Sequence, residues 1–244
     1  MSAAQVPDNA DSPTLDDGIR VRSSERWLVV HLPGAHSVAS WAIVGGGLST
    51  ATAVVWHRVE GSELRPPIDA HQLLGERMVR EGLAGAVGLL TSRRLDRYCD
   101  TEAIYGSVRA RCVATVGLSN AVRIGDPPDS TDSSSPKSGP ATVNILCRIS
   151  TPLRCEALLE SLSLAAEART AALIRAGVRR GTDPLPATGT GTDCIVVAAP
   201  DAPSGQSYAG KHTAIGHVIG ASVERAVLAG ALAWKQERCG GELF

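Results

Sequence analysis

The stretch Ala187-Thr188-Gly189-Thr190-Gly191-Thr192-Asp193 runs directly into the apolar segment Cys194-Ile195-Val196-Val197-Ala198-Ala199-Pro200. Glycine permits backbone angles that other residues avoid, so the first part can fold tightly and turn its N–H groups toward a ligand. The threonine hydroxyls and the Asp193 carboxylate add polar contacts. Short Gly/Thr patterns also occur in ordinary connections. We therefore expect a buried strand over 194–200, preceded by either a ligand-binding loop or a plain polar connection.

The composition favours a globular protein with a large core. The chain has 244 residues, of which 43% are hydrophobic and 20% charged, and its formal net charge is -1. It contains four Trp, three Tyr and one Phe, which leaves few aromatic side chains for base stacking. Because the chain has neither an excess of positive charge nor a set of aromatic residues for base stacking, we expect no nucleic-acid partner. The length fits one domain over 19–244.

Several segments bear on domain boundaries and location. Residues 1–18 are acidic and contain Pro7 and Pro13, which predicts a disordered tail and not a signal peptide. Residues 125–140 are rich in Ser, Pro, Asp and Gly, which predicts a flexible surface loop. We see no apolar run that approaches membrane-spanning length and expect no membrane contact. A cytoplasmic protein follows.

The six cysteines are scattered, with no C-x-x-C pair, and no two histidines have a metal-binding spacing. We interpret the cysteines as reduced core residues, and the sequence indicates no required cofactor. It leaves the need for a divalent metal open.

Apolar periodicity predicts a mixed α/β fold in one domain, with an early hairpin about a glycine turn and at least three covering helices. The expected strands are 27–32, 40–44, 50–56, 86–92, 108–116, 141–147 and 194–200, with glycines at 45–47 in the hairpin. The expected helices are 69–81, capped by Asp69, then 156–176, stopped by Gly177, and 213–234, capped by Thr213 or Ser207. Hairpins so early in the chain argue against a purely parallel sheet.

Small polar side chains stand where several of these strands begin or end. They are Thr91-Ser92, Thr115 to Asn120, and Asp193. In α/β proteins the ends of strands commonly carry ligand sites. Asn144 stands inside an apolar strand and needs hydrogen-bond partners. The pattern predicts a site at one end of the sheet.

The helix over 156–176 is apolar nearly all round, yet it carries Glu167 and Arg169. Burial of an unpaired charge costs several kcal/mol, so each should meet a counter-charge, a network or a substrate, unless it reaches solvent. The last helix follows Lys211-His212, which would stand at the positive end of the helix dipole. That position suits an anion or oxyanion, although a lone histidine or lysine is more commonly a surface residue. The helix's apolar face (Ile215, Ile219, Ala226, Val227) fits either core packing or a homodimer.

Six motifs, in order, resemble the adenosylcobinamide amidohydrolase (CbiZ-type) family over roughly residues 27–234. They are Gly88-Leu89-Leu90-Thr91-Ser92, Gly117-Leu118-Ser119-Asn120-Ala121 with Gly125-Asp126, Thr142-Val143-Asn144, Glu167-Ala168-Arg169-Thr170-Ala171-Ala172-Leu173, Thr188-Gly189-Thr190-Gly191-Thr192-Asp193 and Tyr208-Ala209-Gly210-Lys211-His212-Thr213. Two positions differ from the family pattern. Val44-Gly45-Gly46 stands where Asn-Gly-Gly is frequent, and Arg169 where lysine is frequent.

The resemblance implies hydrolysis of the amide that joins the corrin ring to aminopropanol in adenosylcobinamide, giving adenosylcobyric acid for cobalamin and corrinoid salvage. The corrinoid is then the substrate and small-molecule partner. Amide hydrolysis needs an activated nucleophile, oxyanion stabilisation and a proton for the leaving amine.

The candidate catalytic residues are Asp193 or Glu167, as general base on water or to orient His212, and His212 as proton donor. The Asp193 carboxylate should then face Glu167 or His212 across one pocket. Backbone N–H groups of the 189–192 loop or the 210–212 turn would hold the oxyanion. The substrate-binding candidates are Ser119, Asn120, Asn144, Arg169, Thr190, Gly191, Thr192 and Lys211.

Two alternatives to this mechanism and function stay open. A covalent route would use Ser119, Thr190 or Cys194 as nucleophile, although Cys194 lies in an apolar run and no serine stands in a Gly-x-Ser-x-Gly elbow. We favour attack by water. The other alternative is a non-catalytic module that binds a corrinoid or a nucleotide through the same loops.

Overall fold

The computed structural model describes residues 17–127 and 141–239 of the chain. The apolar segment Cys194–Pro200 forms strand β10, with the bounds predicted from the sequence. β10 pairs antiparallel with β2 (Trp27–Ser40) on one side and parallel with β8 (Val143–Ile149) on the other. It therefore joins the two halves of the main sheet.

The main sheet has eight strands in the order β4-β3-β2-β10-β8-β6-β5, with β1 paired to β2. Its other strands are β1 (Arg20–Ser23), β3 (Gly47–Arg58), β4 (Val87–Thr91), β5 (Cys99–Tyr105) and β6 (Val108–Val116). The β3–β4 and β8–β10 pairs are parallel and the others antiparallel. The short strands β7 (Ala121–Val122) and β9 (Gly189–Thr190) form a separate ladder. The sheet is mixed, as predicted.

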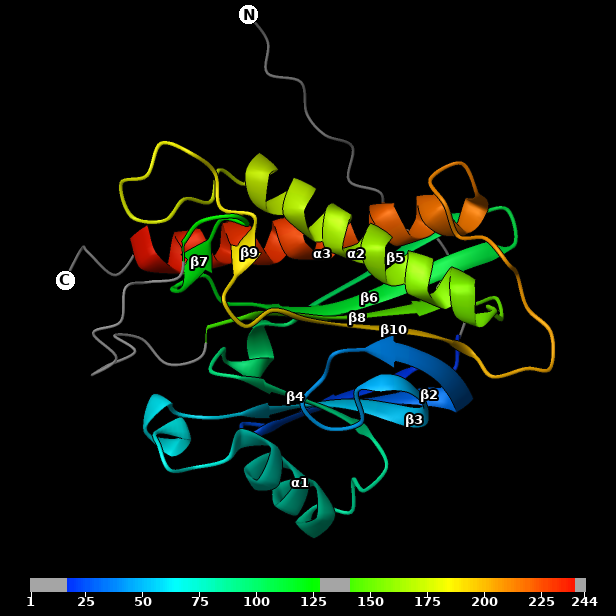
Figure 1. Ribbon diagram of the computed structural model, residues 1–244, viewed down its shortest axis with the longest axis horizontal. Helices are drawn as coiled ribbons and strands as arrows, with labels where there is room; N and C mark the ends of the chain where they lie inside the picture. The colour runs from blue at the N-terminus through cyan, green and yellow to red at the C-terminus, as the bar shows by residue number, and fades with distance from the viewer. Residues whose placement is uncertain (1–16, 128–140, 240–244) are drawn as a thin grey trace, which may run out of the picture.

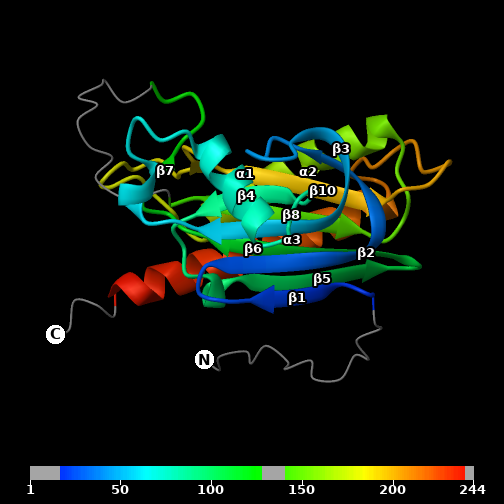
Figure 2. The ribbon, with the colours of Figure 1, turned by 90° about the horizontal axis from the view of Figure 1, so that it is seen from below.

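Helices cover both outer faces of the sheet. α2 (Cys155–Arg175) and α3 (Ala214–Cys239) lie together over the half made by β10, β8, β6 and β5, while α1 (Ala70–Arg80) lies under β3 and β4 (Figure 1). Seen from below, α1 lies over β4 (Figure 2). Short 3-10 turns, η1 (Gly61–Leu64) and η2 (Leu95–Arg97), precede α1 and β5. The fold is thus mixed α/β with three described α-helices.

Alternation along β10 explains how one strand serves two cores. Ile195, Val197 and Ala199 belong to the cluster beneath α2 and α3. Val196 and Ala198 belong to the cluster shared with the β2–β3–β4 half of the sheet. Successive side chains of a strand point to opposite faces, so a strand buried on both faces needs a continuous apolar run. A third cluster packs α1 against β3 and β4.

The first hairpin differs in detail from the prediction. β2 continues through residues 33–39 with an irregular register between His31 and His36, because Pro33 cannot donate to the ladder and Gly34 has a φ of 96°. β2 then ends at Ser40, so residues 41–44 belong to the turn and not to a strand. The glycine turn itself is confirmed, with φ of 71° at Gly45 and 88° at Gly47.

The helix ends follow the expected caps. The Asp69 carboxylate accepts hydrogen bonds from the first-turn N–H groups of α1. Gly177 follows α2 with a φ of 63°. The Thr213 hydroxyl accepts a hydrogen bond from the Gly216 N–H at the start of α3. Four strands were not predicted. β7 and β9 are only two residues long, β1 is mostly polar, and the middle of β5 is the polar run Asp100-Thr101-Glu102, so none of them has a clear apolar period.

α3 is long and apolar enough to cross a membrane by length and composition, which the sequence interpretation did not foresee. More than half of that span is buried inside the protein, as in the core helix of a globular fold. Its face formed by Ile215, Ile219, Ala226 and Val227 is buried against the sheet, so core packing accounts for it.

Three of the described cysteines, Cys112, Cys147 and Cys194, are buried as expected, whereas Cys155 is exposed at the start of α2. The predicted tail over 1–18 and loop over 125–140 lie largely outside the described residues.

Candidate functional site

Three strand ends meet at one end of the sheet, and two of them, the end of β6 and the start of β10, are among those that the polar pattern indicated. Val116, the last residue of β6, pairs with Val143, the first of β8. Cys194, the first residue of β10, pairs with Asn144. The β7–β9 ladder then joins the segment after β6 to the loop before β10. The Gly/Thr loop therefore stands among residues that are distant in sequence.

The Asp193 carboxylate holds this loop together. Its Oδ2 accepts a hydrogen bond from the Thr190 N–H at 3.0 Å and lies 2.9 Å from Nη1 of Arg169. Its Oδ1 accepts hydrogen bonds from the Val143 N–H at 3.0 Å and from the Thr190 hydroxyl. The Asp193 side chain is 6% exposed. We expected it to face Glu167 or His212; its contacts are instead to Arg169, Thr190 and Val143.

Burial raises the pKa of Asp193, although the Arg169 charge and the hydrogen bonds from Thr190 and Val143 act to lower it. Desolvation disfavours the charged carboxylate, which makes it a stronger base than an exposed aspartate. The result is a buried carboxylate that is already hydrogen-bonded to a hydroxyl.

Three other residues of the loop are also fixed by local contacts. A Cβ on Gly189 would lie 2.5 Å from Oδ2 of Asp193, so only glycine leaves room for the carboxylate. The Thr188 hydroxyl accepts a hydrogen bond from the Ile124 N–H at 2.7 Å. The Thr192 carbonyl accepts one from the Thr142 hydroxyl at 2.6 Å. These hydrogen bonds and close contacts fix the conformation of the loop, so it is not a plain polar connection.

Some polar groups here are left available for a ligand. No described group accepts a hydrogen bond from the N–H of Gly191 or Thr192, and both residues are exposed. Oδ1 of Asn120 is buried without a described partner, and the Asn120 amide lies beside Gly191. Ser119 precedes it and is half-buried. Two backbone N–H donors and the Asn120 side chain therefore lie in or beside the loop that carries the Thr190 hydroxyl.

The Asn144 side chain makes its hydrogen bonds within the protein. Its Nδ2 donates to the Leu90 carbonyl at 2.7 Å, and its Oδ1 lies 3.2 Å from the Thr142 hydroxyl. The side chain is buried between the two halves of the sheet. Asn144 is therefore better placed to tie β8 to β4 than to contact a substrate.

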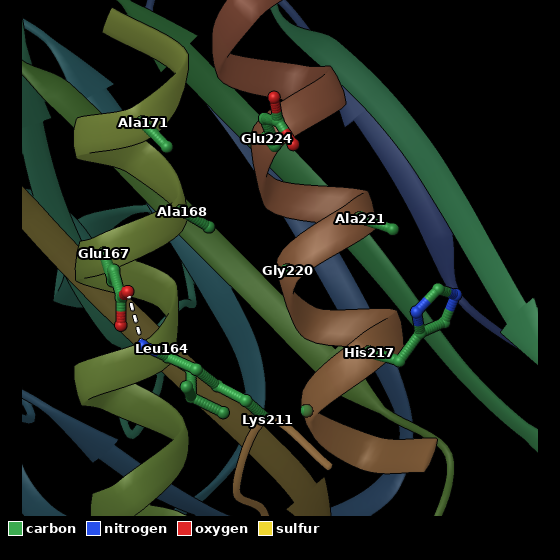
Figure 3. A pocket seen from close by; sticks show the side chains of 10 residues that line it. Leu164, Glu167, Ala168, Ala171, Lys211, His217, Gly220, Ala221 and Glu224 are labelled. Atoms are coloured by element: carbon green, nitrogen blue, oxygen red, sulfur yellow. Dashed lines mark hydrogen bonds and ion pairs between the residues drawn. The ribbon is translucent and has the colours of Figure 1, made fainter. Parts of the chain in front are cut away.

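Glu167 and Arg169, the two charged residues of α2 that the sequence singled out, lie in different surroundings. Arg169 is 16% exposed and meets Asp193, which confirms the expected counter-charge. Glu167 is exposed, contrary to the predicted burial, because it lies on the outer face of α2 and pairs there with Lys211 at 2.6 Å. Figure 3 shows this pair at a groove between α2 and α3.

The groove has a volume of about 400 Å³ and is lined by Glu167, Lys211, His217, Glu224 and small residues of both helices. Its charged groups are largely solvated. Asp193 is not among the lining residues, so the structure divides the predicted catalytic set between two places.

His212 is exposed and immediately precedes the Thr213 cap of α3. The adjacent Ala209 N–H already donates to Glu160 at 2.7 Å. The negative charge of Glu160 beside this turn opposes an oxyanion there. The 189–192 loop is the better oxyanion candidate of the two that the sequence offered.

Sequence reasoning missed Thr142, Glu160 and Trp41. The indole Nε1 of Trp41, in the β2–β3 turn, donates to the Asp193 carbonyl at 2.7 Å. No local pattern signals a contact across 152 positions. Val44, whose effect the sequence left open, packs in the α1 cluster and bridges to Gly88.

The chemistry of other candidate groups is limited. Burial raises the pKa of the Cys194 thiol to about 12, despite its contact with Ser40, so it is a poor nucleophile. Within residues 17–127 and 141–239, no group of three or more His, Cys, Asp or Glu side chains is arranged to hold a metal ion.

The fold and site define an α/β protein whose polar loop, at the ends of three strands, carries a buried carboxylate–hydroxyl pair. The chain belongs to the adenosylcobinamide amidohydrolase family (CbiZ), which it matches over residues 12–239. The family assignment supports a hydrolytic role.

Two further proteins are similar to this chain. An uncharacterised protein from Methanocaldococcus jannaschii is 38% identical over 94 residues, which are 38% of this chain and 36% of that protein, so the match spans about a third of the relative. A beta-aminopeptidase from Burkholderia sp. has a TM-score of 0.44 and 13% identity, with 88% of this chain and 79% of that chain covered. Neither match bears on individual site residues.

Proposed function

We propose that this protein hydrolyses the amide between the corrin ring and aminopropanol of adenosylcobinamide, giving adenosylcobyric acid and free aminopropanol. Family membership supports the substrate class. The observation that carries the reaction is the hydrogen bond from the Thr190 hydroxyl to the buried Asp193 carboxylate. A nucleophile hydrogen-bonded to a base is the arrangement that acyl transfer requires.

The geometry favours Thr190 as the nucleophile over the water attack that the sequence suggested. The two oxygens of Asp193 accept from Thr190 N–H, Thr190 hydroxyl, Val143 N–H and Arg169. A carboxylate offers about four lone-pair positions, so little capacity remains for a water molecule. The hydroxyl already donates to the base, whereas a water would have to displace an existing partner.

Thr190 acts as the nucleophile and Asp193 as its general base. Thr190 Oγ1 bonds to the amide carbon, its proton passes to Asp193, and the N–H groups of Gly191 and Thr192 stabilise the oxyanion. The C–N bond breaks as that proton passes to the leaving amine. Water then hydrolyses the ester, giving the carboxylic acid and returning a proton to Thr190 through Asp193. Arg169 holds Asp193 in position.

The test is incubation of the full chain with adenosylcobinamide, with chromatography for aminopropanol and adenosylcobyric acid. Thr190→Ser keeps a hydroxyl and should retain turnover, whereas Thr190→Val should lose at least about a hundredfold. Mass spectrometry of a quenched reaction should show the acyl adduct on Thr190. Full turnover by Thr190→Val would overturn the covalent route and restore attack by water.

The same assay separates the two places that hold predicted catalytic residues. Glu167→Gln and His212→Ala should keep turnover within a few fold, because neither side chain is among the described contacts of Asp193. Loss of turnover in these two variants, with Thr190→Val unaffected, would move the active site to the helical groove. Tight binding without product in the unmodified protein would instead favour a corrinoid-binding module.

A further inference from the structure

We propose that Trp41 is a substrate-binding residue whose indole receives one face of the substrate's corrin ring, a role that rests on the function proposed above. Trp41 is 49% exposed, although tryptophan is the side chain with most to gain from burial. Its single polar group, Nε1–H, donates to the Asp193 carbonyl at 2.7 Å. The indole is therefore attached to the catalytic loop while its ring remains open to solvent.

The turn that carries Trp41 is held on both sides. The Ser40 hydroxyl donates to the Ile195 carbonyl at 2.8 Å and accepts from the Ala42 N–H at 3.0 Å. Beyond Trp41, the N–H of Gly88 donates to the Val44 carbonyl at 2.8 Å. A Cβ on Gly46 would lie 2.4 Å from the Ala42 carbonyl oxygen, so the turn closes tightly. Trp41 is thus presented by a fixed backbone, which lowers the entropy cost of binding.

A second apolar side chain of the same turn is also exposed. Ile43, two residues after Trp41, is 40% exposed. Exposed apolar residues beside a polar site are typical of a ligand-binding surface. Trp56 shows the contrast, because it is fully buried within the sheet core. Core packing explains Trp56 and does not explain Trp41.

The chemistry of the site matches a corrinoid. A corrin is a flat macrocycle with apolar faces and neutral amide arms around its rim. Arg169 and Asp193 neutralise one another, so the loop favours neutral amides over anions. Trp41 is hydrogen-bonded to Asp193, the residue that follows Thr192. With the corrin ring against Trp41, an amide arm of the ring can therefore reach the free N–H groups of Gly191 and Thr192.

Equilibrium binding of adenosylcobinamide, followed by absorbance and by quenching of tryptophan fluorescence, tests the proposal with three substitutions. Trp41→Phe keeps an aromatic face, Trp41→Gln keeps a hydrogen-bond donor, and Trp41→Ala keeps neither. We expect Trp41→Phe to bind within about threefold of the unmodified protein, and Trp41→Gln and Trp41→Ala to bind about tenfold or more weakly. Trp27→Phe, at the opposite end of β2 from Trp41, is the matched control and should bind normally.

The outcomes separate this role from the proposed function. If Trp41→Gln binds normally and Trp41→Phe does not, the indole serves only as a hydrogen-bond brace and the stacking role is wrong. Normal hydrolysis with unchanged binding in Trp41→Ala overturns the role and leaves the function standing. Loss of binding in Trp41→Ala, in a protein that forms no product, supports the role and overturns the hydrolysis. Absence of both binding and hydrolysis in the unmodified protein overturns both.

Discussion

Nη1 of Arg169 lies 2.9 Å from Oδ2 of Asp193, and this ion pair joins helix α2 to the loop before the central strand β10. Both side chains are mostly buried, so removal of either leaves a charge with little access to water. The pair therefore connects the stability of the fold to the geometry of the candidate site.

Asp193→Asn and Arg169→Gln should each lower the free energy of unfolding by about 3 kcal/mol, because each leaves a buried charge unpaired. In the double variant the losses should fall short of the sum by about 1–3 kcal/mol. Urea denaturation measures all three. The exposed Arg80–Glu76 pair of α1 is the matched control, with an expected coupling below about 0.5 kcal/mol. Strictly additive losses at Arg169 and Asp193 would contradict the pairing.

Gly189→Ala should destabilise the protein and reduce activity. The added Cβ would lie 2.5 Å from Oδ2 of Asp193, so the carboxylate must leave its position. We expect a loss of about 1–3 kcal/mol, comparable to breaking a buried polar contact. Gly75→Ala, in the middle of α1 with open space around it, should instead stabilise by up to about 1 kcal/mol. Thermal unfolding of both variants decides the matter; a harmless Gly189→Ala would mean that the carboxylate lies elsewhere.

Thr115→Val should leave stability unchanged or raise it by about 1 kcal/mol, because the buried Thr115 hydroxyl has no described partner and valine has the same shape. Thr142→Val should act in the opposite direction. The Thr142 hydroxyl donates to the Thr192 carbonyl at 2.6 Å, and its loss should cost about 1–2 kcal/mol. Calorimetry can compare the two. A destabilised Thr115→Val variant would indicate a partner for that hydroxyl.

Acid should destabilise the protein partly through His57. Burial and the adjacent Arg77 lower the pKa of His57 to about 4 from 6.5, despite its contact with the Arg26 carbonyl and the charge of Glu63. Between these values the unfolded chain binds the proton and the folded chain does not, so stability is full above pH 6.5 and falls toward pH 4. The shift corresponds to about 3 kcal/mol.

Unfolding midpoints measured from pH 7 to pH 4 should show this fall, and His57→Gln should flatten it. His71→Gln, at an exposed position of α1, should keep the slope of the unmodified protein. An unchanged slope in His57→Gln would assign the acid sensitivity to other groups.

The elements that follow from local residue patterns could be predicted from the amino-acid sequence. The continuous apolar run of 194–200 indicated a strand buried on both faces, and β10 has those bounds. Asp69 and Thr213 cap the starts of α1 and α3, and Gly177 follows the end of α2, as their chemistry favours. The requirement that Arg169 find a counter-charge also followed from its place on an apolar helix.

Which side chains meet depends on how the whole chain packs. Glu167 and Arg169 are two residues apart, but α2 turns one toward solvent and the other toward the loop, and a periodicity of 3.6 does not say which face the sheet covers. Trp41 reaches Asp193 only because β2 and β10 are neighbours in the sheet. Such contacts depend on strand order and on the packing of distant segments, which no local pattern encodes.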